Sequence, residues 1–146
     1  MILHAGLVAG RIDGAWKGAL LVGASGSGKS DLMLRAMGLG LRLVADDRTV
    51  VWVSGSRLFG RAPETLGGLI ELRGLGVLSE PALPMAEIAL VVRCEPAETL
   101  ERMPEDAFDT IAGARVPLVR LHAPDASAPA KLGRALNRLG RGRGAA

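Results

Sequence analysis

A glycine-rich segment early in the chain has the spacing of a phosphate-binding loop. Glycines let backbone N–H groups turn toward phosphate oxygens, and a helix that starts directly after such a loop adds partial positive charge. Lys29 would contact the β and γ phosphates, and the Ser30 hydroxyl would ligate Mg²⁺. The pattern predicts a nucleotide-binding P-loop, and a glycine-rich turn without nucleotide is the alternative. The segment matches G-x-x-x-x-G-K-[ST] with Gly23, Ala24, Ser25, Gly26, Ser27, Gly28, Lys29 and Ser30.

Two adjacent acids, Asp46 and Asp47, follow an apolar stretch that predicts a strand over residues 41–45. Acids at the carboxyl end of a strand face the crevice in which phosphates bind. Neighbouring strand residues point to opposite sides. We therefore expect one acid to serve Mg²⁺ or its waters and the other to act as a base, as phosphoryl transfer requires. A solvated acidic turn is the alternative.

His4 and Glu71 are two further candidates. His4 lies on the strand expected over residues 3–8, which an Asp13-Gly14 turn folds back against the strand leading to the loop. From chemistry alone, a surface or core histidine is the more frequent role. Glu71 stands inside an apolar strand, where burial would demand a cation partner, either Arg73 or a metal.

The elements that must position these residues alternate between strands and helices. This order predicts an α/β fold with a mixed sheet flanked by helices. No repeat or low-complexity linker divides the chain, so residues 1–146 are expected to form a single domain. Strands are expected over residues 3–8, 18–22, 41–45, 50–53, 69–72, 88–94 and 116–121, and helices over 30–37, 63–66, 98–112 and 129–139.

The composition argues against several classes of function. Aromatic residues make up 3% of the 146 residues, which argues against base stacking and so against nucleic acid as a partner. Cys94 is the single cysteine, expected as a buried thiol in an apolar strand, and it can form no internal disulfide. No apolar run approaches the ~18 residues of a membrane span, and no signal peptide is recognisable. No membrane association is expected, and the expected location is the cytoplasm.

The net charge of +3 is concentrated at the C-terminal end. Removing the five cations that follow Asp125 leaves residues 1–130 with a net charge of −2. Three of the five fall on one side of the expected helix, within a basic helix and tail over residues 128–146. A solvated helix face is the simpler interpretation, and docking of an acidic or phosphorylated partner is the alternative. The five cations are Lys131, Arg134, Arg138, Arg141 and Arg143.

Four segments, in this order, resemble the catalytic domain of HPr kinase/phosphorylase. They are His4-Ala5-Gly6, the loop 23–30, Leu43-Val44-Ala45-Asp46-Asp47, and residues 69–76 with Glu-Leu-Arg-Gly-Leu-Gly. The loop alone is generic, but its combination with the other segments is specific to that family. The resemblance implies a P-loop core similar to phosphoenolpyruvate carboxykinase, commonly assembled as a hexamer. It also implies ATP-dependent phosphorylation of a serine of HPr, a phosphocarrier protein of the sugar/nitrogen phosphotransferase system, and in many members removal of that phosphate by phosphorolysis.

The resemblance also assigns roles to individual residues. Asp47 matches the aspartate that takes the proton from the substrate serine, and Asp46 beside it is the acid expected to serve Mg²⁺. The catalytic residues are then His4, Lys29, Asp47 and Arg102, and the metal ligands are Ser30, Asp46 and Glu71.

Two features differ from the family pattern. Most members have an N-terminal domain before the histidine, so the resemblance implies a short form. The family also has a Val-Arg-Pro-Gly-Arg-Asn segment linked to phosphorolysis, where this chain has Arg-Leu-His-Ala-Pro-Asp at residues 120–125. The resemblance therefore supports an ATP- and Mg²⁺-dependent kinase of an HPr-like carrier and does not extend to the phosphorylase direction. A non-catalytic ATP-sensing module and a P-loop kinase of a small metabolite are the alternatives.

Overall fold

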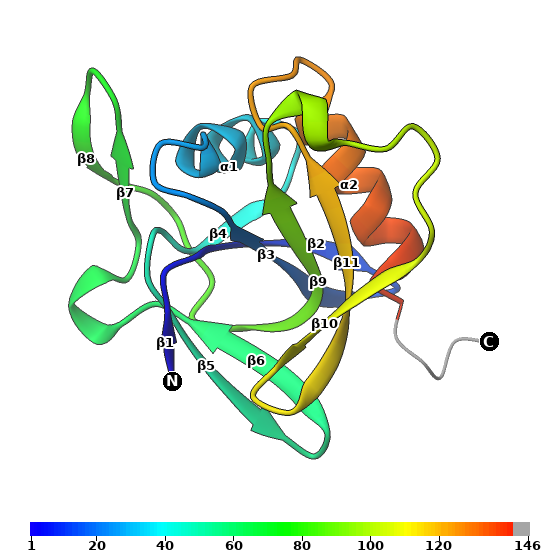
Figure 1. Cartoon of the computed structure of the whole chain (residues 1–146). Coiled ribbons are helices and arrows are strands. Elements are labelled where there is room, and N and C mark those ends of the chain that lie inside the picture. Colours follow the sequence, from blue (N-terminus) through cyan, green and yellow to red (C-terminus); the bar gives the residue numbers. More distant parts are fainter. Residues whose placement is uncertain (142–146) are drawn as a thin grey trace.

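Among residues 1–141, which the computed structural model describes, nine strands form one curled, mixed sheet and two helices cover one of its faces (Figure 1). This confirms the predicted α/β class with a mixed sheet. The strands are β1 (Ile2–Leu3), β2 (Gly6–Ile12), β3 (Ala15–Val22), β4 (Arg42–Ala45), β5 (Thr49–Ser54), β6 (Arg57–Arg61), β9 (Ala86–Cys94), β10 (Ala107–Ile111) and β11 (Ala114–Leu121). Their order is β1-β5-β6-β9-β3-β2-β4, with β11 beside β9 and β10 beside β11.

The centre of the sheet is a parallel trio of strands, β3, β9 and β11. Val91 on β9 is in register with Leu20 on one side and with Leu118 on the other. Because the three strands run in the same direction, their carboxyl ends lie at the same edge of the sheet, where ligands bind in open α/β folds. The glycine-rich loop follows β3 at this edge, and the chain leaves β9 and β11 beside it.

The two faces of the sheet are buried in different ways. On one face pack α1 (Lys29–Met37) and α2 (Ala128–Leu139), whose Leu32 and Leu132 are fully buried against apolar side chains of β2, β3 and β9. On the other face, Leu20 belongs to a second apolar cluster with Leu58 and Val116. Within the described residues, no helix covers this face. The sheet curls so that the β5–β6 and β10–β11 hairpins bring Leu58 and Val116 against it (Figure 1).

A small two-stranded ribbon is separate from the nine-stranded sheet and packs beside α1, with Ile70 fully buried in the core (Figure 1). It consists of β7 (Leu69–Leu72) and β8 (Gly76–Ser79) and follows a short 3-10 helix, η1 (Glu64–Leu66). The chain returns to the body after β8, where the Leu83 N–H donates to the Leu43 carbonyl at 2.9 Å. Glu71 is therefore carried on a ribbon outside the main sheet, and the segment that follows the ribbon is hydrogen-bonded to β4.

Most predicted elements are confirmed, but one was assigned the wrong type. The expected helix over 98–112 is instead a 3-10 turn, η2 (Ala97–Thr99), an exposed loop and strand β10. Ala112 and Gly113 adopt φ of 49° and 85°, which forms a tight hairpin turn that pairs β10 with β11. The strand expected over 3–8 is interrupted, because His4 lies in a bend between β1 and β2. Strands β6 and β8 were not predicted.

The remaining expectations concern the termini and Cys94. Cys94 is 4% exposed, as expected for a buried thiol. In the basic C-terminal segment, Arg141 pairs with Asp13 at 2.7 Å, and Arg143 lies outside the described residues. Within residues 1–141, no helix is long and apolar enough to cross a membrane.

Candidate active site

The glycine-rich loop connects β3 to the first residue of α1, the strand–loop–helix context that the sequence predicts. Two of its glycines are required by close packing. A Cβ on Gly23 would lie 2.8 Å from the Cys94 carbonyl oxygen, and a Cβ on Gly28, whose φ is 94°, would lie 3.2 Å from the Ala123 Cβ. Side chains at either position would push the loop off the ends of β9 and β11.

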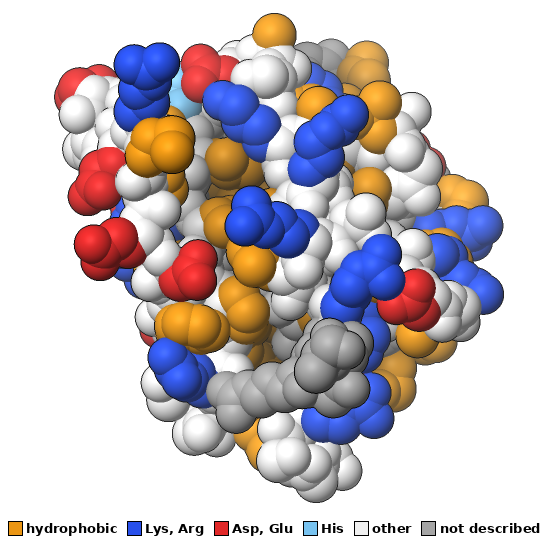
Figure 2. Space-filling view, turned by 90° about the vertical axis from the view of Figure 1, so that its right-hand side faces the viewer, with side chains coloured by type: hydrophobic (Ala, Val, Ile, Leu, Met, Phe, Trp, Pro, Cys, Tyr) orange, Lys and Arg blue, Asp and Glu red, His pale blue; other side chains and the backbone are white. Residues whose placement is uncertain are grey.

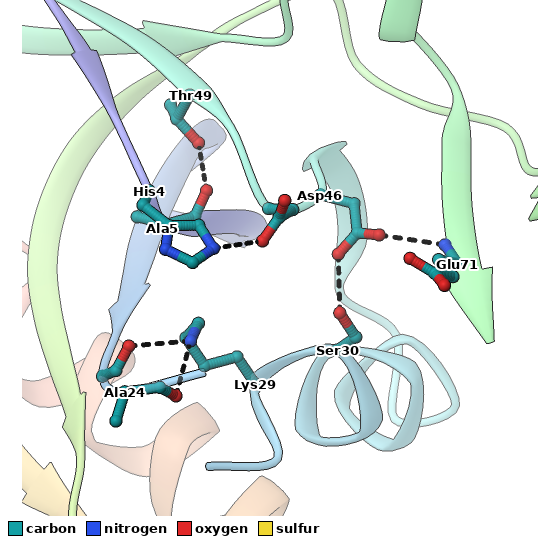
Figure 3. Close-up of polar contacts among 10 residues, drawn as sticks. His4, Ala5, Ala24, Lys29, Ser30, Asp46, Thr49 and Glu71 are labelled. Atoms are coloured by element: carbon teal, nitrogen blue, oxygen red, sulfur yellow. Dashed lines mark hydrogen bonds and ion pairs between the residues drawn. The ribbon is translucent and has the colours of Figure 1, made fainter. Parts of the chain in front are cut away.

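Lys29 folds back over the loop that precedes it (Figure 3). Its Nζ donates to the carbonyl oxygens of Gly23 at 2.8 Å and Ala24 at 3.0 Å, and the residue is only 8% exposed. Nearby, Ser27 Oγ is buried and is the one such side-chain atom among the described residues without a hydrogen-bond partner. An ammonium group and an unused hydroxyl donor within one loop suit an anion with several oxygens, such as a phosphate.

Asp46 joins three segments through its two carboxylate oxygens (Figure 3). Ser30 Oγ donates to Oδ1 at 2.8 Å, and the backbone N–H of Glu71 donates to Oδ2 at 2.9 Å. The sequence suggested that a buried Glu71 would need a cation partner. Glu71 is exposed, so its carboxylate requires no such partner. A hydroxyl and carboxylates are the hard oxygen donors that suit Mg²⁺.

The three predicted metal ligands therefore lie together, but they do not form an all-protein cage. Among residues 1–141, no group of three or more His, Cys, Asp or Glu side chains could hold a metal ion. Mg²⁺ characteristically binds through one or two carboxylates together with waters and substrate phosphates. The donor set of Ser30, Asp46 and Glu71 fits that mode of binding.

Asp47 points away from Asp46 and contacts His4. His4 Nε2 lies 2.5 Å from Asp47 Oδ1, and the two side chains are 57% and 54% exposed. The two acids were expected to point in different directions because neighbouring strand residues alternate. They do diverge, but the cause is different: Asp47 lies beyond the end of the strand and adopts φ of 66°. Asp tolerates this left-handed conformation better than most residues.

Thr49 fixes the position of this pair. It is fully buried, and its hydroxyl donates to the Ala5 carbonyl at 2.8 Å, next to His4 (Figure 3). Leu3 and Thr49 are also in register between β1 and β5. Thr49 was not among the residues predicted from the sequence, since a threonine after an acidic turn carries no signal that separates it from any other strand residue.

Arg102 is not brought together with the other candidates. It lies in the exposed loop between η2 and β10 and makes no hydrogen bond or ion pair with any residue of the described chain. The structure thus gathers six of the predicted side chains around the loop, and leaves one outside. The six are His4, Lys29, Ser30, Asp46, Asp47 and Glu71.

Cys94 lies beneath the loop, and its chemistry is that of a structural residue. Burial raises the pKa of its thiol, and the nearby charge of Lys29 opposes this effect only in part. The thiol is therefore protonated at neutral pH and is a poor nucleophile.

Most of the chain matches one protein-family model. Residues 4–132 match the family model described as the HPr Serine kinase C-terminal domain. The chain is 35% identical over 137 residues to the HPr kinase/phosphorylase of Limosilactobacillus reuteri, which covers 86% of this chain and 41% of that protein. It is 39% identical over 112 residues to the HPr kinase/phosphorylase of Leptothrix cholodnii, covering 68% of this chain and 34% of that protein.

One solved structure resembles the fold closely. The Hpr(Ser) kinase/phosphatase from Coxiella burnetii superimposes with a TM-score of 0.80 at 23% identity, covering 94% of this chain and 89% of that chain. The matches to these two curated relatives span 41% and 34% of their length. From the family model and these relatives, the chain belongs to the HPr serine kinase C-terminal domain family.

Proposed function

We propose that this chain is a protein-serine kinase that transfers the terminal phosphate of ATP, with Mg²⁺, to a serine of an HPr-like phosphocarrier protein. The observation that carries the proposal is the 2.5 Å contact between His4 and Asp47 beside a loop suited to phosphates. Family membership supports an HPr-like carrier as the partner.

Asp47 is the proposed base. In the transfer, the serine oxygen forms a bond to the γ phosphorus, the bond from that phosphorus to the β–γ bridging oxygen breaks, and ADP leaves. The hydroxyl proton passes to Asp47, while His4 holds the carboxylate in place from its other side. Both side chains are about half exposed, so a serine on the surface of another protein can reach them.

The glycine-rich loop is the proposed phosphate site. Its backbone N–H groups and the start of α1 would bind the phosphates, and Lys29 and Ser27 would add an ammonium and a hydroxyl donor. Ser30, Asp46 and Glu71 would hold Mg²⁺. When bound, the ion neutralises charge on the transferring phosphate.

The proposal covers the kinase direction only. Segment 120–125 lacks the Val-Arg-Pro-Gly-Arg-Asn sequence that the family associates with phosphorolysis. Its own Arg120 and His122 are engaged by Glu95, at 3.1 Å to the carboxylate and 2.9 Å to the backbone carbonyl.

Incubation with an HPr-like carrier of the same organism and Mg·ATP, followed by mass spectrometry of the carrier, tests the proposal. We expect a mass gain of one phosphate group, and none on a carrier whose acceptor serine is replaced by alanine. Nucleotide binding without any mass gain would instead support an ATP-sensing module. ADP release that depends on a metabolite and needs no carrier would support a metabolite kinase. The hexamer and the likeness to phosphoenolpyruvate carboxykinase stay predictions from the resemblance.

A further inference from the structure

A pocket of about 200 Å³ lies where the chain leaves β9 and β11. It is lined by residues of the segment after η2, of the end of β11 and of the first turn of α2. In the sheet, β9 and β11 lie on one side of β3, whereas β2 and β4 lie on the other. The pocket therefore flanks the glycine-rich loop on the side opposite Asp46 and Asp47.

The pocket and the loop share a wall. His122 and Asp125 line the pocket, and Ala123 and Pro124 between them face Gly28. A Cβ on Gly28 would lie 3.2 Å from the Ala123 Cβ and 3.9 Å from the Pro124 Cδ. A molecule whose phosphates occupy the loop thus has the pocket directly beside it.

We propose that this pocket holds the adenine nucleoside of the triphosphate. The inference rests on the proposed function, in which the terminal phosphate faces Asp47. A nucleoside triphosphate is an elongated molecule with its base and its terminal phosphate at opposite ends. With the terminal phosphate beside the acids, the nucleoside extends to the other side of the loop, toward β9 and β11.

The lining of the pocket has the mixed character that a nucleoside needs. Leu100, Pro104 and Leu121 offer apolar surface to the base, while Glu101 and Asp125 offer carboxylates to the ribose hydroxyls. Figure 2 looks onto this face of the molecule, where a furrow with hydrophobic side chains on its floor runs between acidic side chains on one side and basic ones on the other.

His122 makes the pocket selective for adenine. Its Nδ1 lies 2.9 Å from the Glu95 carbonyl oxygen, which can only accept, so Nδ1 carries the proton of this hydrogen bond. In the neutral ring, Nε2 is then an acceptor. An acceptor pairs with the 6-amino group of adenine and not with the 6-oxo group of guanine.

The walls of the pocket are held before any ligand binds. The Glu95 carboxylate accepts from Arg120 Nε at 3.1 Å and from Thr99 Oγ1 at 3.0 Å, which joins the ends of β9 and β11. On the loop side, Arg35 of α1 donates to the carbonyls of Ala123 and Asp125. A site organised in this way loses little conformational entropy on binding.

Calorimetry with Mg²⁺ and three probes, ADP, GDP and inorganic pyrophosphate, tests the proposal. For the native chain we expect ADP to bind more tightly than both GDP and pyrophosphate. In His122→Phe, which keeps a ring but removes the acceptor, ADP should bind about tenfold more weakly and pyrophosphate unchanged. Glu98→Gln, an exposed change on η2 outside the pocket, should match the native chain. Equal losses for ADP and pyrophosphate, or no loss for either, would overturn the proposal.

Photolabelling of the native chain with 8-azido-ADP gives a readout that does not depend on a variant folding. Labelled peptides should contain residues 100–104 or 121–131, and labelling confined to other segments would overturn the proposal. The two proposals fail separately. If the protein phosphorylates its carrier but binds ADP and pyrophosphate equally well, the nucleoside pocket is wrong and the kinase proposal stands. If ADP binds more tightly than GDP and pyrophosphate but no carrier is phosphorylated, the kinase proposal is wrong and the nucleoside pocket stands.

Discussion

The contact between His4 and Asp47 joins residues that are 43 positions apart in the sequence. The residue types and their order in the chain were enough to propose both, but not to pair them. Their pairing depends on the left-handed backbone of Asp47 and on the register between β1 and β5, and neither is encoded by a local pattern. Arg102 was assigned a role through the family resemblance only, and the structure places that residue in an exposed loop.

Asp47→Asn tests the base. The amide keeps the size of the carboxylate but cannot accept the serine proton, so we expect transfer to the carrier to fall by at least about a hundredfold. Binding of Mg·ADP should persist, because within residues 1–141 the side chain of Asp47 is hydrogen-bonded to His4 and not to a loop residue that would bind phosphate. Calorimetry and carrier mass spectrometry measure the two effects. Unchanged transfer would remove Asp47 as the base.

Thr49→Val tests how the pair is held. Valine has nearly the same shape but leaves the buried carbonyl of Ala5 without its donor, which should lower the free energy of unfolding by about 1–3 kcal/mol. Urea denaturation measures this loss. Thr110→Val, at an exposed position on β10, is the matched control and should change stability by no more than about 0.5 kcal/mol. Equal effects of the two changes would contradict the positioning role of Thr49.

At the scale of elements, the central strands, the loop and both helices followed from apolar patterns and glycine spacing. The β10 strand did not, because residues 98–112 have too few apolar positions to separate period 2 from period 3.6. Pairing with β11 decides the outcome, since it supplies partners for the β10 backbone. The β7–β8 ribbon was predicted only in its first strand, because Val77 and Leu75 are apolar yet exposed.

Two glycine substitutions test whether backbone conformation governs these elements. Gly113, with φ of 85°, forms the β10–β11 turn, so Gly113→Ala should destabilise the protein by about 1 kcal/mol. Gly133 lies within α2, where an added Cβ would meet nothing within 4 Å. Gly133→Ala should therefore stabilise it by up to about 1 kcal/mol. Thermal and urea unfolding of both variants checks these signs, and a shared sign would contradict the argument.

At the scale of the whole molecule, the basic residues of α2 and the proposed catalytic pair of His4 and Asp47 lie on different elements. The basic residues of α2 are exposed, while His4 and Asp47 follow the ends of β1 and β4. The same helix also buries Leu132 and Leu136 in the core, so it is part of the fold as well as a charged surface. The formal charge of +3 therefore reflects the cations near the C-terminal end, three of which lie on α2, and not the surroundings of Asp47.

The double variant Arg134→Gln/Arg138→Gln tests whether this face binds the carrier. Both side chains are exposed, and neither forms an ion pair with a residue of the described chain. We expect the KM for the carrier and the free energy of unfolding to stay unchanged, as for a solvated face. A KM raised severalfold at low salt, with unfolding unchanged, would show that the face docks the carrier instead.

The inward fold of Lys29 has a consequence for the timing of ligand binding. Its ammonium is already surrounded by two carbonyl dipoles, so an incoming phosphate replaces neutral acceptors and does not have to strip water from an exposed charge. The loop is ordered by its own cation before the ligand arrives. When a phosphate binds, the ammonium of Lys29 exchanges its two carbonyl acceptors for phosphate oxygens. When the product leaves, the ammonium returns to the carbonyls, so the loop keeps its conformation.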